Sequence, residues 1–282
     1  MNCIICESSS SKLLYNNTLK RCNQCGFITA NTEISDVVLS EIYSENYFKG
    51  GEYLNYLSDK DGIVKNFKNR LLEIKKIYPN FNPSNAIEIG CAYGLFGELL
   101  KKEYPTTDYI GYDVVPEACK HANEELKLNV KCENYLNNTI NNNYSDIFLW
   151  DVIEHLPNPA LFIKKLSEQS KSGSRIYIST GDISSLLAKI QGSKWRQIHP
   201  PSHLHYFSKQ TLSRLLENEG FITKKVFYPS VSRSLKQIFY SLFLLNKQST
   251  SKIINGIYNR IPENSYFNIN TYDLLFLIAE KK

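Results

Sequence analysis

From residue 86 onward, the chain alternates between short apolar runs and segments with helical spacing. The apolar runs predict strands at 86–89, 109–113, 130–133, 146–150, 175–179, 222–228 and 274–279. Between them, apolar positions that recur every three or four residues predict helices at 96–103, 116–126, 160–169 and 209–218. Strands that are apolar throughout and alternate with helices predict an α/β fold. We expect a Rossmann-like, seven-stranded, mostly parallel sheet with helices on both faces.

Besides the N-terminal residues 1–32, two segments lie outside this alternation. Residues 33–80 combine a tyrosine-rich stretch with helical spacing at 63–77, and we interpret them as a helical lid or linker. Residues 231–270 carry more apolar side chains than one solvent-facing helix can bury. We expect an apolar helical insertion there that covers substrate, associates with a second copy or contacts a membrane surface. Residues 81–230 together with 271–282 then form the α/β domain.

The N-terminal residues 1–32 are set apart by two pairs of cysteines. Cys3 and Cys6 form one C-x2-C pair, and Cys22 and Cys25 form a second pair, separated from the first by fifteen residues. Paired thiolates at this spacing are typical of a tetrahedral zinc site, and a core this small needs such a metal to hold it together. The alternative is four buried or reactive cysteines. We expect a zinc ribbon with one structural Zn²⁺.

Composition and charge exclude several classes of protein. The 282 residues are 42% hydrophobic and 22% charged, which excludes a wholly disordered, collagen-like or coiled-coil chain. The longest apolar runs fall short of the roughly 18–20 residues that a membrane span needs. A net charge of +5 permits a nucleic-acid partner without favouring one. Because no signal peptide is visible, we expect a cytoplasmic protein, in which Cys91, Cys119 and Cys132 are small buried residues.

The chemical signal of the α/β domain lies where its first strand ends. Gly90 and Gly94 follow Glu88 at the start of a helix, and Asp113 ends the second strand. The glycines allow a sharp turn, the helix N-terminus suits an anionic group, and an acidic residue after the second strand can accept hydrogen bonds from ribose. The dinucleotide fingerprint would need glycine at position 92, which is alanine here. An alternative is that both glycines serve helix–sheet packing alone.

Three stretches of sequence resemble the class I S-adenosylmethionine-dependent methyltransferases. Residues 87–97 are similar to that family's first motif, and residues 146–159 to its fourth-strand motif. Residues 192–208 resemble a subgroup linked to polysaccharide assembly, some of whose sugar methyltransferases also carry an N-terminal zinc ribbon. The resemblance implies S-adenosyl-L-methionine as cofactor. The cofactor-binding residues that we expect are Glu88, Gly90, Cys91, Ala92, Gly94, Asp113, Glu133, Asp151 and Tyr47.

Two groups of side chains keep more than one interpretation each. The tyrosines of residues 43–56 either cover a sheet edge or form a lid over the cationic sulfonium. His199, His203 and His205 suit a metal cluster, a hydrogen-bonded structural role or contact with the acceptor, although no carboxylate or cysteine lies near them in sequence. As catalytic residues we favour His203 over His205 as general base, and His155 either lines the site or caps the packing.

The leading function is methyl transfer to a hydroxyl of a sugar, a nucleotide sugar or a glycan-related small molecule. A zinc ribbon also suits an RNA methyltransferase, but residues 1–32 hold only three cationic side chains, Lys12, Lys20 and Arg21. A third alternative is a non-catalytic, cofactor-binding scaffold whose zinc module binds a partner. The acceptor and the oligomeric state stay open at this point.

Overall fold

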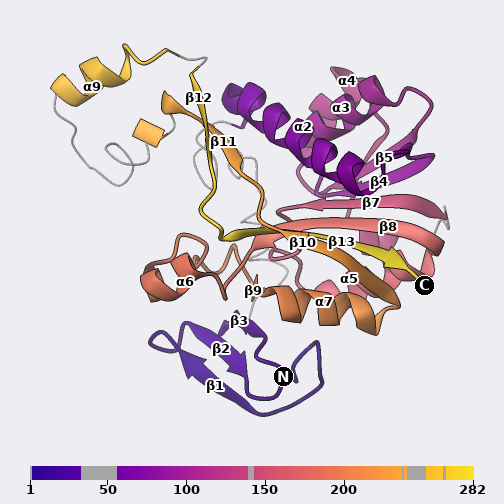
Figure 1. Cartoon of the computed structure of the whole chain (residues 1–282), viewed down its shortest axis with the longest axis vertical. Helices are drawn as coiled ribbons and strands as arrows, with labels where there is room; N and C mark the ends of the chain where they lie inside the picture. The colour runs from indigo at the N-terminus through magenta and orange to yellow at the C-terminus, as the bar shows by residue number, and fades with distance from the viewer. Residues whose placement is uncertain (1, 33–55, 139–142, 237, 240–251, 263–264) are drawn as a thin grey trace.

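The computed structural model describes residues 2–32, 56–138, 143–236, 238–239, 252–262 and 265–282. They form a central α/β domain, a small N-terminal sheet below it in Figure 1, and a two-stranded sheet that rises beside it. Tyr43, Tyr47 and Tyr53, which we expected in a lid, lie outside the described residues.

The central sheet has seven strands in the order β10-β13-β8-β7-β4-β5-β6. Five of them run parallel: β4 (Asn85–Ile89), β5 (Asp108–Asp113), β6 (Val130–Cys132), β7 (Tyr144–Trp150) and β8 (Ser170–Gly181). One strand, β13 (Leu274–Lys281), runs antiparallel between β8 and β10 (Phe221–Phe227), so β10 runs in the same direction as the other five. The predicted seven-stranded, mostly parallel sheet is therefore confirmed.

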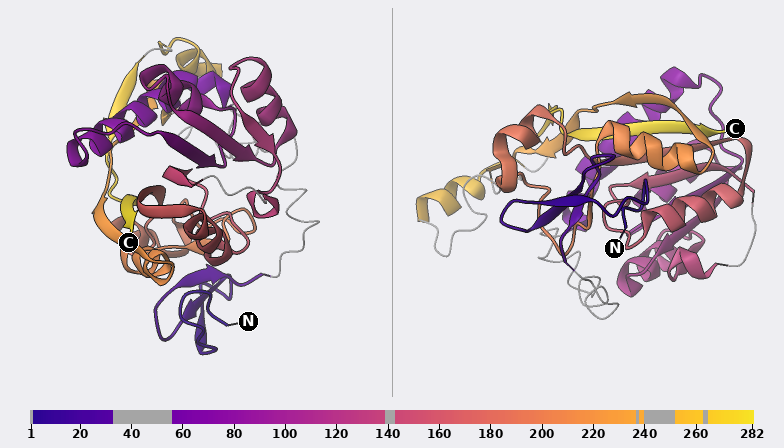
Figure 2. Two further views of the ribbon diagram at one scale, coloured as in Figure 1. Left: turned by 90° about the vertical axis from the view of Figure 1, so that its right-hand side faces the viewer. Right: turned by 90° about the horizontal axis from the view of Figure 1, so that it is seen from below.

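Helices cover both faces of this sheet (Figures 1 and 2). One face carries α2 (Lys60–Ile77), α3 (Leu95–Glu103) and α4 (Pro116–Glu124), and the other carries α5 (Pro159–Glu168) and α7 (Lys209–Asn218). Between β8 and β9 (His205–Tyr206) lies α6 (Leu186–Gln191), and short 3₁₀ turns occupy Leu57–Asp59, Tyr135–Asn137 and Gly192–Lys194.

Alternate side chains of the central strands feed two separate cores. In β7, Ile147 and Leu149 pack toward α5 and α7, whereas Phe148 and Trp150 pack toward α2 and α3. Successive strand residues point to opposite faces, so a strand covered on both sides is apolar at every position. This explains why the sequence shows continuous apolar runs here.

The N-terminal module, residues 2–32, is joined to the α/β domain by backbone pairing. It contains β1 (Ser11–Leu14), β2 (Leu19–Cys22) and β3 (Ile28–Ala30). A fourth strand, β9 (His205–Tyr206), comes from the α/β domain and pairs antiparallel with β3. The module therefore lies against the segment that carries His203 and His205.

We expected the insertion at 231–270 to be helical, but its described residues are helical only in part. Its described ends are two antiparallel strands, β11 (Val231–Ser234) and β12 (Tyr266–Ile269), and α9 spans Lys252–Tyr258. The side chain of Asn66 on α2 binds the backbone of β11. It donates to Ser232 O at 3.1 Å and accepts from Ser232 N at 2.6 Å. Among the described residues, no helix is both long and apolar enough to cross a membrane.

Candidate active site

The turn after β4 is shaped by two glycines with different roles. Gly90 has φ +68°, and a Cβ there would lie 2.5 Å from Val152 Cγ2, on the loop after β7. Gly94 has φ +79°, and a Cβ there would lie 2.9 Å from the Cβ of Ala122 on α4. Only glycine adopts a positive φ without strain and also leaves out the Cβ that would meet these neighbours. Gly90 thus lets the β7 loop approach the turn, and the surroundings of Gly94 favour the packing interpretation.

Asp113 holds this turn through backbone hydrogen bonds. Its Oδ2 accepts from the N–H of Ala92 at 2.7 Å, and its Oδ1 accepts from the N–H groups of Val114 and Val115 at 2.8 and 3.0 Å. Ala92 adopts φ +47°, an unusual conformation for a residue with a side chain. Burial raises the pKa of Asp113, while the three backbone donors act against that rise. Because a carboxylate offers about four lone-pair sites, it can still accept from a ligand.

Glu88 lies beneath the turn rather than on its surface. It is 2% exposed, and its Oε2 accepts a 2.5 Å hydrogen bond from the Tyr109 hydroxyl. Gly97 leaves room for that tyrosine, since a Cβ at position 97 would lie 2.5 Å from the ring. Burial raises the pKa of Glu88 well above its ordinary value. In this structure the side chain of Glu88 is therefore buried and bonded to Tyr109 rather than open to a ligand.

Arg70 and Asp151 form an ion pair at the carboxyl end of β7. Arg70 Nη2 lies 2.9 Å from Asp151 Oδ2, and the guanidinium lies 5.0 Å from the centre of the Trp150 ring. The Arg70 side chain is 9% exposed, whereas that of Asp151 is 37% exposed. Ser179 donates to the second oxygen, Asp151 Oδ1, at 3.0 Å. The pair thus presents a cation and an anion side by side next to the turn.

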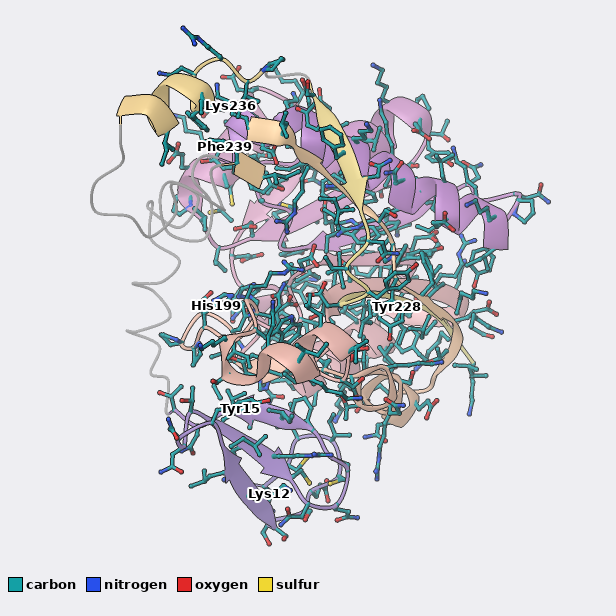
Figure 3. The ribbon with its side chains drawn as sticks, turned by 60° about the vertical axis from the view of Figure 1, so that its left-hand side comes forward. Lys12, Tyr15, His199, Tyr228, Lys236 and Phe239 are labelled. Carbon is teal, nitrogen blue, oxygen red and sulfur yellow. The ribbon has the colours of Figure 1, made fainter. Side chains whose placement is uncertain are left out.

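The structure separates the predicted histidines into two environments. His205 stacks on Phe27 of the N-terminal module at 5.6 Å between ring centres, with its Nε2 3.4 Å from Pro157 O. Burial lowers the pKa of His205 to about 4. His203 instead lies 4.5 Å from His155 and 3.8 Å from His199, ring centre to ring centre. In Figure 3, His199 is on the side of the domain that faces Tyr15 of the module.

A buried carboxylate joins His155 and His203. Glu154, which is 4% exposed, brings a carboxylate oxygen within 4.8 Å of a ring nitrogen of each histidine. The Glu154 carbonyl accepts from Leu204 N at 2.9 Å and from His205 N at 3.1 Å, which fixes the loop after β7 against the histidine segment. Burial, and then the nearby Asp151 carboxylate, raise the pKa of Glu154 to about 8. We call these three residues the Glu154 cluster.

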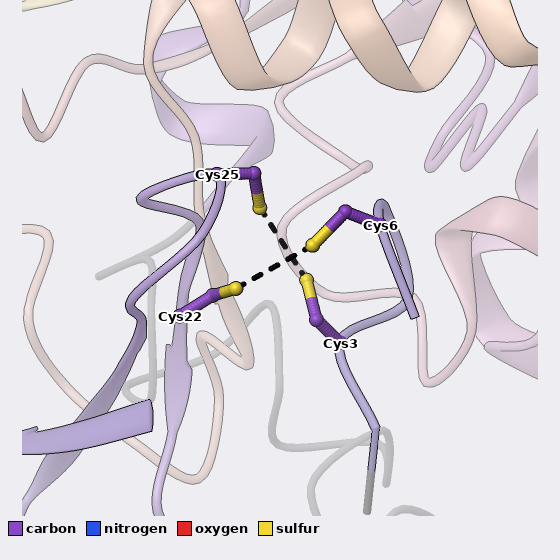
Figure 4. Close-up of side chains that lie close together, drawn as sticks. All are labelled: Cys3, Cys6, Cys22 and Cys25. Carbon is purple, nitrogen blue, oxygen red and sulfur yellow. Dashed lines mark hydrogen bonds between the residues drawn. The ribbon is translucent and has the colours of Figure 1, made fainter. Parts of the chain in front are cut away.

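The four N-terminal cysteines converge as their spacing predicts (Figure 4). Cys3 and Cys25 lie 3.5 Å apart, Sγ to Sγ, and so do Cys6 and Cys22. Tetrahedral zinc with bonds of about 2.3 Å requires sulfur atoms about 3.8 Å apart. The four thiols therefore fit one such ion.

The remaining predicted residues and two missed ones complete the site. Of the predicted cofactor residues, Cys91 is buried and Glu133 is exposed. Of the cysteines that we expected to be buried, Cys91 and Cys119 are buried, but Cys132 is exposed because β6 ends there at the sheet edge. The sequence analysis missed Arg70 and Glu154. Arg70 could have been found as a cation on the apolar face of the 63–77 helix. Spacing in the sequence did not single out Glu154, because His203, which lies beside it in the structure, comes from a distant segment.

We compared the chain with family models, curated proteins and solved structures. A family model described as "Methyltransferase domain" matches residues 56–224. A mitochondrial ubiquinone biosynthesis O-methyltransferase from Dictyostelium discoideum is 35% identical over 112 residues, which are 34% of this chain and 35% of that protein. The matched region thus spans about a third of the length of this curated relative.

Two solved structures share the fold. A magnesium protoporphyrin IX methyltransferase from Synechocystis PCC 6803, with bound SAH, has a TM-score of 0.56 at 12% identity; the match covers 88% of this chain and 100% of that one. The [4+2]-cyclase SpnF has a TM-score of 0.52 at 12% identity, over 76% of this chain and 81% of its own. At such low identity these likenesses concern the fold alone, and the cyclase illustrates that the fold does not fix the reaction.

Proposed function

The chain belongs to the methyltransferase domain family, and from that membership we propose that it transfers the methyl group of S-adenosylmethionine to an oxygen of a small-molecule acceptor. The observation that carries the proposal is the turn of residues 90–94, which Asp113 clamps through the Ala92 N–H at 2.7 Å. Ligands of open α/β sheets bind beyond the carboxyl ends of the parallel strands, where this turn lies.

The cofactor's amino-acid end is complementary to the ion pair of Arg70 and Asp151. The methionine part of the cofactor carries one carboxylate and one ammonium group. Arg70 has donors beyond the one that reaches Asp151, and Asp151 keeps lone pairs for an ammonium group. In this arrangement Arg70 binds the carboxylate, Asp151 binds the ammonium, and the turn lies beneath the chain that joins them.

The nucleoside end of the cofactor binds at the carboxyl ends of β5 and β6. Asp113 accepts from the ribose hydroxyls through its remaining lone pairs. Val114, which is 44% exposed, offers an apolar surface beside it for adenine, and Glu133 is exposed after β6. In this arrangement the proposed cofactor residues lie at the carboxyl ends of β4, β5, β6 and β7.

The acceptor oxygen binds at the Glu154 cluster. In the transfer, the acceptor oxygen forms a bond to the methyl carbon while the carbon–sulfur bond breaks, and S-adenosylhomocysteine leaves. A sugar or phenol hydroxyl is a poor nucleophile until its proton is removed, so the acceptor needs a basic or electrophilic group nearby. The Glu154 cluster supplies such groups, whereas the burial of His205 against Phe27 favours a packing role for that histidine.

The choice of an oxygen acceptor is supported by the curated O-methyltransferase relative. The narrower choice of a sugar derivative rests on the resemblance of residues 192–208 to sugar methyltransferases. Of the module's three basic side chains, Lys12 and Arg21 lie opposite each other on β1 and β2, and Lys20 lies opposite Leu13, which together make a small surface for RNA. No nucleic-acid partner is therefore favoured.

Methyl transfer from isotope-labelled S-adenosylmethionine tests this proposal. The acceptors to compare are nucleotide sugars, free sugars, a catechol and RNA, with label incorporation followed by mass spectrometry. We expect label in an alcohol or phenol, and strongly reduced label with Arg70→Met. Label in RNA alone would overturn the small-molecule acceptor, and label on nitrogen or carbon would overturn the O-methyl assignment.

We also propose that Cys3, Cys6, Cys22 and Cys25 bind one structural Zn²⁺. The converging thiols support it, and so does the small size of the module's own core. Because β3 of this module pairs with β9, the metal also stabilises the segment that carries His203. Covering of substrate, self-association or membrane-surface contact by residues 231–270 stays a prediction, as does the cytoplasmic location.

A further inference from the structure

The Glu154 cluster brings together one carboxylate and two imidazoles from two distant segments. Glu154 and His155 follow β7, and His203 precedes β9. One ligand atom from each lies within 4.8 Å of the other two. Glu154 and His203 are 4% and 6% exposed, so two of the three side chains are buried.

Backbone carbonyls fix which nitrogen of each histidine carries hydrogen. His155 Nδ1 lies 2.9 Å from Ser202 O, and His203 Nδ1 lies 2.9 Å from Gln197 O. A carbonyl oxygen only accepts hydrogen bonds, so both Nδ1 atoms are donors. Each neutral ring then keeps its lone pair on Nε2. Histidines that bind metals are commonly oriented in this way, by a carbonyl on the other ring nitrogen.

Glu154 adds an independent sign that the cluster binds a cation. Its Oε2 is buried and has no hydrogen-bond partner in the described structure. A buried carboxylate oxygen without a partner is costly, because it has lost water and gained nothing in exchange. A cation held between this oxygen and the two rings would remove that cost.

We propose that Glu154, His155 and His203 bind one divalent first-row transition-metal cation, such as Zn²⁺, which holds the acceptor oxygen. Two imidazoles and one carboxylate form a common three-ligand set that leaves a position open for substrate. Bonds of about 2.0–2.2 Å bring ligand atoms to about 3–3.5 Å from one another, so modest side-chain movement closes the present spacing.

The proposal deepens the proposed function, on which it rests for the identity of the acceptor. A bound divalent cation lowers the pKa of a coordinated hydroxyl, so its proton passes to water and the oxygen attacks as an anion. The oxygen–carbon bond then forms as the carbon–sulfur bond breaks. In this scheme His203 acts as a ligand rather than as the general base that the sequence suggested.

Counting bound metal tests the proposal independently of activity. The full-length protein is incubated with Zn²⁺, separated from free metal and analysed by mass spectrometry. Because the four cysteines take one ion, we expect two zinc ions per chain in the wild type and one in Glu154→Gln and His203→Ala. Cys22→Ser should retain the ion of the Glu154 cluster. The matched control is His121→Ala, a histidine on α4 outside the cluster, which should retain two.

Equilibrium titration with Co²⁺ of protein that holds its ribbon zinc gives the second readout. We expect about tenfold or greater weakening in Glu154→Gln and His203→Ala, with absorption bands that lack thiolate character. Unchanged stoichiometry and affinity in both variants would overturn the metal site. S-adenosylhomocysteine binding checks that each variant is folded. A wild type that binds the second metal but no S-adenosylhomocysteine would instead contradict the proposed function.

Discussion

Replacing Gly90 by alanine should destabilise the protein through two separable costs. The residue has φ +68°, and this left-handed conformation costs a residue with a side chain about 1–2 kcal/mol. The new Cβ would also lie 2.5 Å from Val152 Cγ2 and 3.0 Å from Val152 Cγ1. Overpacking of this kind costs about 1–3 kcal/mol. The free energy of unfolding should therefore fall by about 2–5 kcal/mol in total.

A second glycine separates the two costs. Gly173 has φ +84°, but a Cβ built there would meet no heavy atom within 4 Å. Gly173→Ala should thus lose only the conformational part, about 1–2 kcal/mol. Val152→Ala removes the side chain that the new Cβ would meet. In a double-mutant cycle, Val152→Ala should therefore recover part of the loss caused by Gly90→Ala.

Urea denaturation of the four variants measures these differences, provided that the dependence on urea concentration stays the same among them. The reasoning predicts that Gly90→Ala costs about 1–3 kcal/mol more than Gly173→Ala. Calorimetry should also show weaker S-adenosylhomocysteine binding to Gly90→Ala, because the turn must shift. Equal losses at both glycines, with no coupling to Val152, would refute the close approach of the two loops.

Three further predictions concern other parts of the molecule. Cys22→Ser should reduce bound zinc by one ion per chain and increase proteolysis within the N-terminal module; unchanged zinc would exclude the four-cysteine site. Arg70→Met should weaken S-adenosylhomocysteine binding about tenfold or more in calorimetry, whereas the exposed Lys68→Met should not. Burial raises the pKa of Glu88, so the folded state binds more protons than the unfolded state above about pH 4.5, and stability falls as pH rises through that range. Urea titrations at pH 5 and pH 8 should show a smaller fall in the free energy of unfolding for Glu88→Gln than for the wild type. The same change in both proteins would contradict this prediction.

The order and type of the main elements could be predicted because burial on both faces makes each strand a continuous apolar run. The predicted strand at 86–89 corresponds to β4, and the predicted helix at 209–218 coincides with α7. The boundaries of β8 were missed, since its first residues, Ser170 to Ser174, are largely polar. The strands β11 and β12 were missed because each depends on pairing with a partner more than thirty residues away.

The candidate site could be predicted only where local spacing carries the information. The cysteine pairs and the turn at residues 90–94 are local patterns, and the four thiols and the clamped turn follow them. Glu154 meets His203 only after two loops fold against each other, so no spacing in the sequence reports that contact. The same dependence separates His203 from His205, which lie two residues apart but face different neighbours.

The central claim is that the turn after β4 and Asp113 bind the methyl donor. Calorimetric titration of the full-length protein with S-adenosylhomocysteine, for wild type and Asp113→Ala, tests it most directly. The matched control is Asp108→Ala, an exposed carboxylate at the start of the same strand. We predict one site per chain, weakened by about 1–3 kcal/mol in Asp113→Ala and unchanged in Asp108→Ala. Equal affinity in all three proteins, or tight binding of NADH in place of S-adenosylhomocysteine, would contradict the claim.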